Sequence, residues 1–121
     1  MKTIKYTDVE TTKNPHGVDA RKIHDNDNVQ VVHILLKEGE SLKKHATPVD
    51  VFFYILEGVG TVEIGNEKQT VSKDMLIESP KNIPHCLSNN STADFRVLVV
   101  KTPKPTKEQK QQAISSILNS K

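Results

Sequence analysis

The residues with the widest chemical range in this sequence are five histidines and a single cysteine. His33, His45 and His85 lie in apolar stretches, whereas His16 and His24 lie in a polar N-terminal region. Neutral imidazole is the commonest side-chain ligand of transition metals and exchanges protons near neutral pH. The three histidines in apolar stretches are therefore the first site candidates, and we expect His16 and His24 to be solvated.

Two of these residues also have a plainer structural interpretation. A histidine among apolar residues, such as His33, is more often packed or at the surface than a ligand. Cys86 directly follows His85, so on a strand it points away from that imidazole, and we expect a small buried residue rather than a nucleophile. One cysteine allows no internal disulfide, which fits a reducing cytosol and predicts a cytoplasmic protein.

The strands that position these residues are predicted from short apolar runs separated by turn signals. The runs are VQVVHILLK, DVFFYILEG, TVEIG, QTVSK, MLIES, IPHCLS and DFRVLVVK. Many short strands at close spacing are typical of an antiparallel sandwich or barrel. The run VFFYIL (51–56) is apolar on both faces, which predicts a cover from a second subunit or from the C-terminal helix. We therefore expect a homodimer.

Polar segments flank this region and complete a predicted single domain. Residues 1–28 form a turn-prone arm with room for one short strand, and residues 29–102 form the barrel. In residues 103–121, Thr106 and Gln109 have the spacing of a capping box at a helix start. The helix carries apolar residues on one face, namely Ala113, Ile114, Ile117 and Leu118.

Composition narrows the range of partners. The chain has 121 residues and a net charge of +2, enough for one core and too little charge to indicate nucleic acid or a membrane surface. No apolar run approaches the roughly 18 residues of a membrane span. We therefore expect neither a nucleic acid nor a membrane as partner.

The segment GESLKKHATPVDVFFYILEG (39–58) resembles the first motif of the cupin superfamily. That motif runs Gly, five residues, His, one residue, His, three or four residues, Glu, six residues, Gly. Gly39, His45 and Gly58 match it at the right spacing. Thr47 stands in place of the second histidine, and Val51 stands in place of the glutamate.

The segment KDMLIESPKNIPHCLSNN (73–90) resembles the second cupin motif through Pro80, His85 and Asn89. Lys73 and Asn82 occupy positions where glycine is usual, and Asn tolerates a left-handed backbone. The resemblance covers roughly residues 29–101. It implies an all-β fold, the double-stranded β-helix or cupin jelly-roll barrel, to which the short C-terminal α-helix is added.

The resemblance also implies a metal site. Cupin sites usually hold Fe, Mn, Ni or Zn with three histidines and one glutamate, and this chain keeps two of the four ligands, His45 and His85. Two imidazoles without a carboxylate would hold a divalent transition metal loosely. His33 from a neighbouring strand, or Asp50 if Pro48 introduces a bulge, could complete the set.

Strand alternation predicts the cavity lining. If His45 points inward, Thr47, Val51 and Phe53 do so as well, whereas Asp50 points outward. The candidates for lining the cavity are His33, Thr47, Val51, Phe53 and Leu87, with Met75 and Ile77 assigned less directly. A mostly apolar lining with a few polar groups is typical of a small-ligand pocket.

Three functions are compatible with this pattern. The first is a small cupin barrel that binds a small molecule, with a weakly held divalent metal in the cavity. The alternative is a metal-dependent cupin enzyme of dioxygenase or isomerase type that acts on a small metabolite. The third is a structural or partner-binding protein with a closed cavity. The sequence offers no clear base, nucleophile or oxyanion donor set, so it names neither reaction nor substrate.

Overall fold

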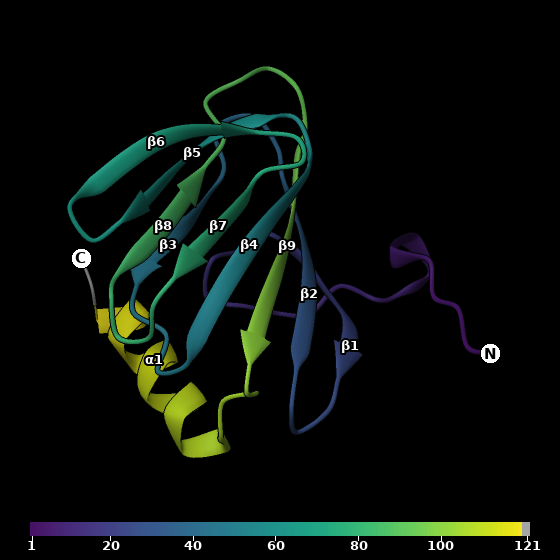
Figure 1. The fold of residues 1–121 in the computed structure, drawn as a ribbon, viewed down its shortest axis with the longest axis vertical. Coiled ribbons are helices and arrows are strands. Elements are labelled where there is room, and N and C mark those ends of the chain that lie inside the picture. Colours follow the sequence, from purple (N-terminus) through teal and green to yellow (C-terminus); the bar gives the residue numbers. More distant parts are fainter. Residues whose placement is uncertain (120–121) are drawn as a thin grey trace.

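The computed structural model describes residues 1–119, with the side chains of 113, 115, 116, 118 and 119 outside the described set. Two antiparallel sheets face each other and leave one end open beside a C-terminal helix (Figure 1). The five-stranded sheet has the order β1 (Asp19–Asp25), β2 (Gln30–Leu36), β9 (Phe95–Thr102), β4 (Asp50–Glu57), β7 (Leu76–Ser79). The four-stranded sheet has the order β3 (Ser41–His45), β8 (His85–Ser88), β5 (Val59–Ile64), β6 (Glu67–Ser72). The predicted all-β fold with a short C-terminal helix is confirmed.

Alternation along the strands builds the core between the two sheets. In β4, Val51, Phe53 and Ile55 are 4%, 1% and 0% exposed, while the intervening Phe52 and Tyr54 are only half-buried. Side chains with this inward parity on both sheets form one hydrophobic cluster. Burial of such apolar surface is the main force that holds the two sheets together.

The N-terminal segment contributes both an arm and a strand. The short strand allowed within residues 1–28 is β1, which pairs with β2 at the edge of the larger sheet. Before it, a 3-10 turn at Tyr6–Asp8 (η1) lies against the sheet. Arg21 holds this turn by donating to the carbonyls of Thr7 and Val9 at 3.2 and 3.0 Å.

The helix α1 (Lys107–Asn119) begins with the expected capping box. Thr106 Oγ1 accepts from the Gln109 amide at 3.2 Å, and the Gln109 side chain accepts from the Thr106 amide at 2.9 Å. Ile114 and Ile117 face the space between the sheets. Ala113 and Leu118, expected on the same face, lie outside the described side chains. No helix of the described residues is long and apolar enough to cross a membrane.

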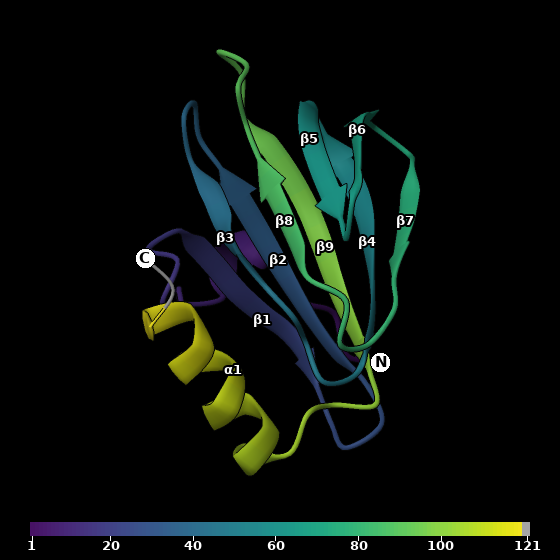
Figure 2. The same cartoon turned by 90° about the vertical axis from the view of Figure 1, so that its left-hand side faces the viewer.

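The position of α1 corrects one expectation about the doubly apolar strand. The helix contacts β3, its Ile114 and Ile117 line the cavity between the sheets, and it stands clear of β4 in Figure 2. It therefore does not cover the outer face of β4, where Phe52, Tyr54 and Leu56 are half-buried. The helix is therefore not the cover that this doubly apolar strand predicts.

Candidate functional site

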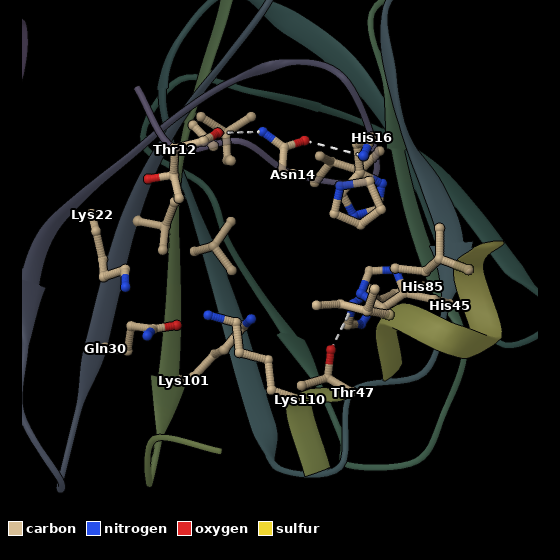
Figure 3. Close-up of a pocket in the computed structure, with 18 of the residues that line it drawn as sticks. Thr12, Asn14, His16, Lys22, Gln30, His45, Thr47, His85, Lys101 and Lys110 are labelled. Atoms are coloured by element: carbon tan, nitrogen blue, oxygen red, sulfur yellow. Dashed lines mark hydrogen bonds between the residues drawn. The ribbon is translucent and has the colours of Figure 1, made fainter. Parts of the chain in front are cut away.

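The inner faces of the two sheets and helix α1 enclose a cavity of about 180 Å³ (Figure 3). Its walls are mostly apolar. Ala20, Val32, Ile34, Leu42, Phe53, Val99, Ile114 and Ile117 form them. Polar groups come from both sides: three histidines and Thr47 on one, Gln30 and lysines on the other.

His45 ends β3 with its imidazole at the cavity. Its Nδ1 lies 2.9 Å from the carbonyl oxygen of Lys43. Because a carbonyl only accepts, Nδ1 carries the proton and donates it, which leaves the Nε2 lone pair available in the neutral ring. Burial lowers the pKa of His45 more than this hydrogen bond raises it, and Lys101 lowers it further. His45 is therefore a neutral imidazole with an accepting nitrogen.

His85, at the start of β8, is 3% exposed and stands beside His45, with ring centroids 4.9 Å apart. Its Nδ1 lies 2.7 Å from Ser79 Oγ, and its Nε2 lies 3.2 Å from Thr47 Oγ1. In the neutral ring one hydroxyl accepts and the other donates. Burial is the main cause that lowers the pKa of His85 to about 3, and the electrostatic influence of the adjacent His45 and Lys101 lowers it further. The two motif histidines thus meet in one neutral, hydrogen-bonded cluster.

His16 joins this cluster, which corrects the expectation that it is solvated. Its Nδ1 accepts from the Lys43 amide at 2.8 Å, and its ring centroid lies 5.1 Å from that of His45. Burial, followed by His45, lowers the pKa of His16 to about 4. The sequence carries only the turn signal Asn14-Pro15 for this placement, and a turn signal does not say where the chain returns.

His33 was expected among the cavity-lining residues, and the structure places it elsewhere. On β2 the side chains of Val32 and Ile34 face the cavity, so His33 points to the opposite face of the sheet. It is 1% exposed, stacks on Tyr6 with centroids 3.7 Å apart, and accepts from Arg96 Nε at 3.1 Å. His33 therefore packs the N-terminal arm onto the barrel and is removed from the candidate site.

The other candidates divide between the cavity wall and the packed core. Thr47 and Phe53 line the cavity, whereas Val51 and Leu87 are buried inside the hydrophobic cluster away from it. Asp50 points outward and accepts from the Lys81 amide at 2.9 Å, so it does not complete a ligand set. Met75 and Ile77 are partly buried against the cluster.

This donor set does not fit a tightly bound resident metal ion. Within residues 1–119, no group of three or more His, Cys, Asp or Glu side chains is placed to hold one. Both nitrogens of His85 are hydrogen-bonded to hydroxyls, and the lining residues include no carboxylate to offset a divalent charge. The cation of Lys101, which depresses the pKa of His85, also opposes a metal ion beside it.

Lysines on the opposite side of the cavity were missed by the sequence analysis. Lys101 on β9 and Lys110 on α1 both line the cavity and extend their side chains into it (Figure 3). Burial lowers the pKa of Lys101, and the neighbouring charges of Lys110 and Lys22 lower it further. The inward parity of Lys101, two residues after Val99, was the available signal.

Two facing antiparallel sheets around a central cavity define a protein of the double-stranded β-helix class. Residues 32–101 match the family model for the cupin domain, so the chain belongs to the cupin family.

Relatives agree with this assignment. The uncharacterized protein MJ0764 from Methanocaldococcus jannaschii is 28% identical over 87 residues, which cover 71% of this chain and 75% of MJ0764. Its crystal structure, described as an RmlC-like cupin with a double-stranded β-helix fold, superposes with a TM-score of 0.67 at 23% identity, covering 78% of this chain and 88% of that one.

Two further solved structures share the fold. TT1209 from Thermus thermophilus has a TM-score of 0.75 and 24% identity, and the match covers 87% of this chain and 100% of TT1209. The polyketide cyclase RemF from Streptomyces resistomycificus has a TM-score of 0.75 and 22% identity over 86% of this chain and 80% of RemF. At these identities the likeness extends to the fold alone.

Proposed function

We propose that this cupin binds a small molecule in the cavity between its sheets. The observation that carries the proposal is a cavity of about 180 Å³ with apolar walls and polar groups on two sides. A dry apolar cavity of roughly 150 Å³ holds benzene, so this one admits a ligand slightly larger than a benzene ring. Apolar walls favour the body of such a ligand, and a few polar groups fix its orientation.

His45 supplies the most accessible of these polar groups. Its Nε2 is an acceptor with no hydrogen bond among the described residues. The Thr47 hydroxyl, shared with His85 Nε2 at 3.2 Å, can reorient toward a ligand. A ligand with one hydroxyl or amide group beside its apolar body matches this end of the cavity.

Filling the cavity should abolish binding. Val32 lines it, so in Val32→Phe the larger ring occupies the ligand's space and thermal shifts across a metabolite panel should disappear. A ligand that binds only the folded protein raises the free energy of unfolding, by about 2.7 kcal/mol when its concentration is 100 times its dissociation constant. The melting temperature rises as a result. The matched control is Val31→Phe, the next residue on β2, whose side chain faces away from the cavity. Equal shifts in both variants would place the ligand elsewhere.

The proposal also includes a divalent transition metal held by His45 and His85. We expect weak binding, because only two imidazoles would hold the ion. Protein purified without added metal should contain less than roughly a tenth of an ion per chain, and added Zn²⁺ should bind with a dissociation constant above about 1 μM. His45→Ala and His85→Ala should each remove that binding, whereas His24→Ala, at an exposed position, should not. Retention of zinc in both cavity variants would contradict the assignment.

A metal-dependent enzyme is the second candidate, favoured by one observation: the His16 imidazole stands 5.1 Å from that of His45, between ring centroids. His16 adds a third imidazole to the two that the sequence indicated, although within residues 1–119 the three rings are not placed around a common ion. A full equivalent of metal in the purified protein, lost in His16→Ala, would favour this candidate over simple binding.

The outer face of the larger sheet supports the homodimer. Phe52, Tyr54 and Leu56 are half-buried there, and Leu76, which pairs with Tyr54, is 52% exposed. A second copy would cover this apolar band. A monomeric mass in light scattering at micromolar concentration would exclude the dimer.

A reducing cytosol is the compartment that we propose for this protein. Its single cysteine, Cys86, is a free thiol, and such a thiol is typical of a reducing compartment.

A further inference from the structure

We propose that the cavity selects an organic anion, a carboxylate on a small apolar body, and that the amino groups of Lys101 and Lys110 bind the carboxylate. This inference rests on the proposed function and names the class of its ligand. It uses the side of the cavity opposite the histidines, to which the cupin motifs contribute nothing.

The first observation is where Lys101 stands. It lies on β9, a central strand of the larger sheet, between Gln30 of β2 and Val51 of β4. Val97 and Val99 precede it on the inward face and are 1% and 8% exposed. Lys101 therefore takes an inward position on a core strand, where alternation calls for an apolar residue. Its aliphatic stem can lie along the apolar wall while its amino group enters the cavity.

The second observation is that this charge lacks a counter-charge. No aspartate or glutamate is among the residues that line the cavity. The nearby carboxylate of Asp25 is taken by Lys104 at 3.0 Å and Lys22 at 3.6 Å. Within residues 1–119, neither Lys101 nor Lys110 forms an ion pair with a carboxylate.

The third observation is that the two unpaired lysines converge. Lys101 reaches the cavity from the sheet and Lys110 reaches it from the helix, and their amino groups extend toward the same region (Figure 3). Lys110 and Lys22 are among the causes that depress the pKa of Lys101, so the like charges interact. Placing like charges together in a partly buried site is unfavourable. An anion between the two amino groups would attract both of them and offset their mutual repulsion.

The rest of the cavity decides which anion fits. Its walls are valine, isoleucine, leucine and phenylalanine side chains, and they surround the space between the lysines and the histidines. An inorganic anion would leave these walls in contact with water. A ligand with one carboxylate and a body of benzene-ring size buries them and also meets both lysines.

Benzoate and benzamide make a matched pair of probes, because they share size and shape and differ in charge. Binding is followed by amide chemical shifts in NMR spectra of the full chain at pH 7.5, with inorganic phosphate as a third ligand. Benzoate should bind at least tenfold more tightly than benzamide, with the largest shifts in β9 and the first turns of α1. Phosphate should bind more weakly than benzoate, because it leaves the apolar walls uncovered.

Lys101→Gln and Lys110→Gln should each weaken benzoate binding about tenfold and leave benzamide unchanged. Lys107→Gln is the control, since it removes the same charge from the same helix at a residue that does not line the cavity. Circular dichroism of each variant checks that the fold is retained.

Several outcomes would overturn the inference. Equal affinity for benzoate and benzamide would show that the cavity does not select for negative charge. If Lys107→Gln weakened benzoate binding as much as Lys101→Gln and Lys110→Gln do, the effect would come from the general positive charge of the surface. Phosphate binding as tightly as benzoate would indicate a site for anions in general. If neutral panel members bind and benzoate does not, this inference fails while the proposed function stands. If nothing binds the cavity, both fail.

Discussion

Replacing Gly58 by alanine is expected to destabilise the barrel by about 3 kcal/mol or more. Gly58 is the single residue between β4 and β5 and has φ +86°, where a side chain costs about 1 kcal/mol on its own. A Cβ there would also overlap the backbone carbonyl oxygen of Asp94 and lie 3.1 Å from the Cα of Phe95. Both obstacles are backbone atoms next to a fully buried ring, so neither can move cheaply.

Gly39→Ala is the matched control, because Gly39 has a similar φ of +82° but no atom within 4 Å of the added Cβ. Its cost should stay near 1 kcal/mol, the backbone contribution alone. Urea unfolding followed by circular dichroism measures both free energies of unfolding. A Gly58→Ala variant no less stable than Gly39→Ala would contradict the close approach of β9 to this turn.

Acid is expected to destabilise the protein well before its carboxylates are protonated. Burial, followed by the charge of Arg96, lowers the pKa of His33 to about 4, and burial lowers that of His85 to about 3. The unfolded chain binds these protons near pH 6.5, whereas the folded chain does not. Stability is therefore fully present above about pH 6.5 and falls as the pH drops toward the folded-state values, with a slope of up to about 1.4 kcal/mol per pH unit for each histidine.

Urea unfolding at pH 7.5, 6 and 5 should show a loss of at least about 4 kcal/mol across this range, roughly 2 kcal/mol each from His33 and His85, to which His16 adds because its pKa is also lowered to about 4. His33→Phe tests the cause, because phenylalanine keeps the stacking on Tyr6 but cannot take up a proton. Its loss between pH 7.5 and pH 5 should be smaller than that of the unchanged protein by roughly 2 kcal/mol, the share of one histidine, because His16 and His85 keep their lowered pKa values. In His24→Gln, which alters an exposed histidine, the loss should be unchanged. Equal stability of the unchanged protein at pH 7.5 and pH 5 would refute the prediction.

The local features of the barrel could be predicted from sequence because each depends on neighbouring residues. Alternation placed Val51 and Phe53 inward and Asp50 outward, which the structure confirms. Asn82 was expected to tolerate a left-handed backbone and has φ +65°. The capping box at Thr106 likewise formed as its spacing indicated.

Only part of the candidate site could be predicted from the sequence. The meeting of His45 and His85 followed from the resemblance to two motifs, but the surroundings of each ring depend on contacts between distant segments. Thr47 and Ser79 reach His85 from two other parts of the chain. His33 was placed on the wrong face because its apolar neighbours made both orientations on β2 plausible. In the structure Val32 and Ile34 line the cavity, so His33 lies on the opposite face of the sheet.

By itself, the sequence determined the period of each strand, the turns between strands and the starting cap of the helix, because these depend on residues a few positions apart. The tertiary structure alone decided which groups face one another across the cavity. His16 comes from the N-terminal arm, Lys101 from β9 and Lys110 from α1. The sequence around each of these residues does not indicate which other residues it faces. The physical reason is that burial and electrostatic interactions depend on distances in space. Between residues far apart in the chain, these distances are set only when the two sheets pack together.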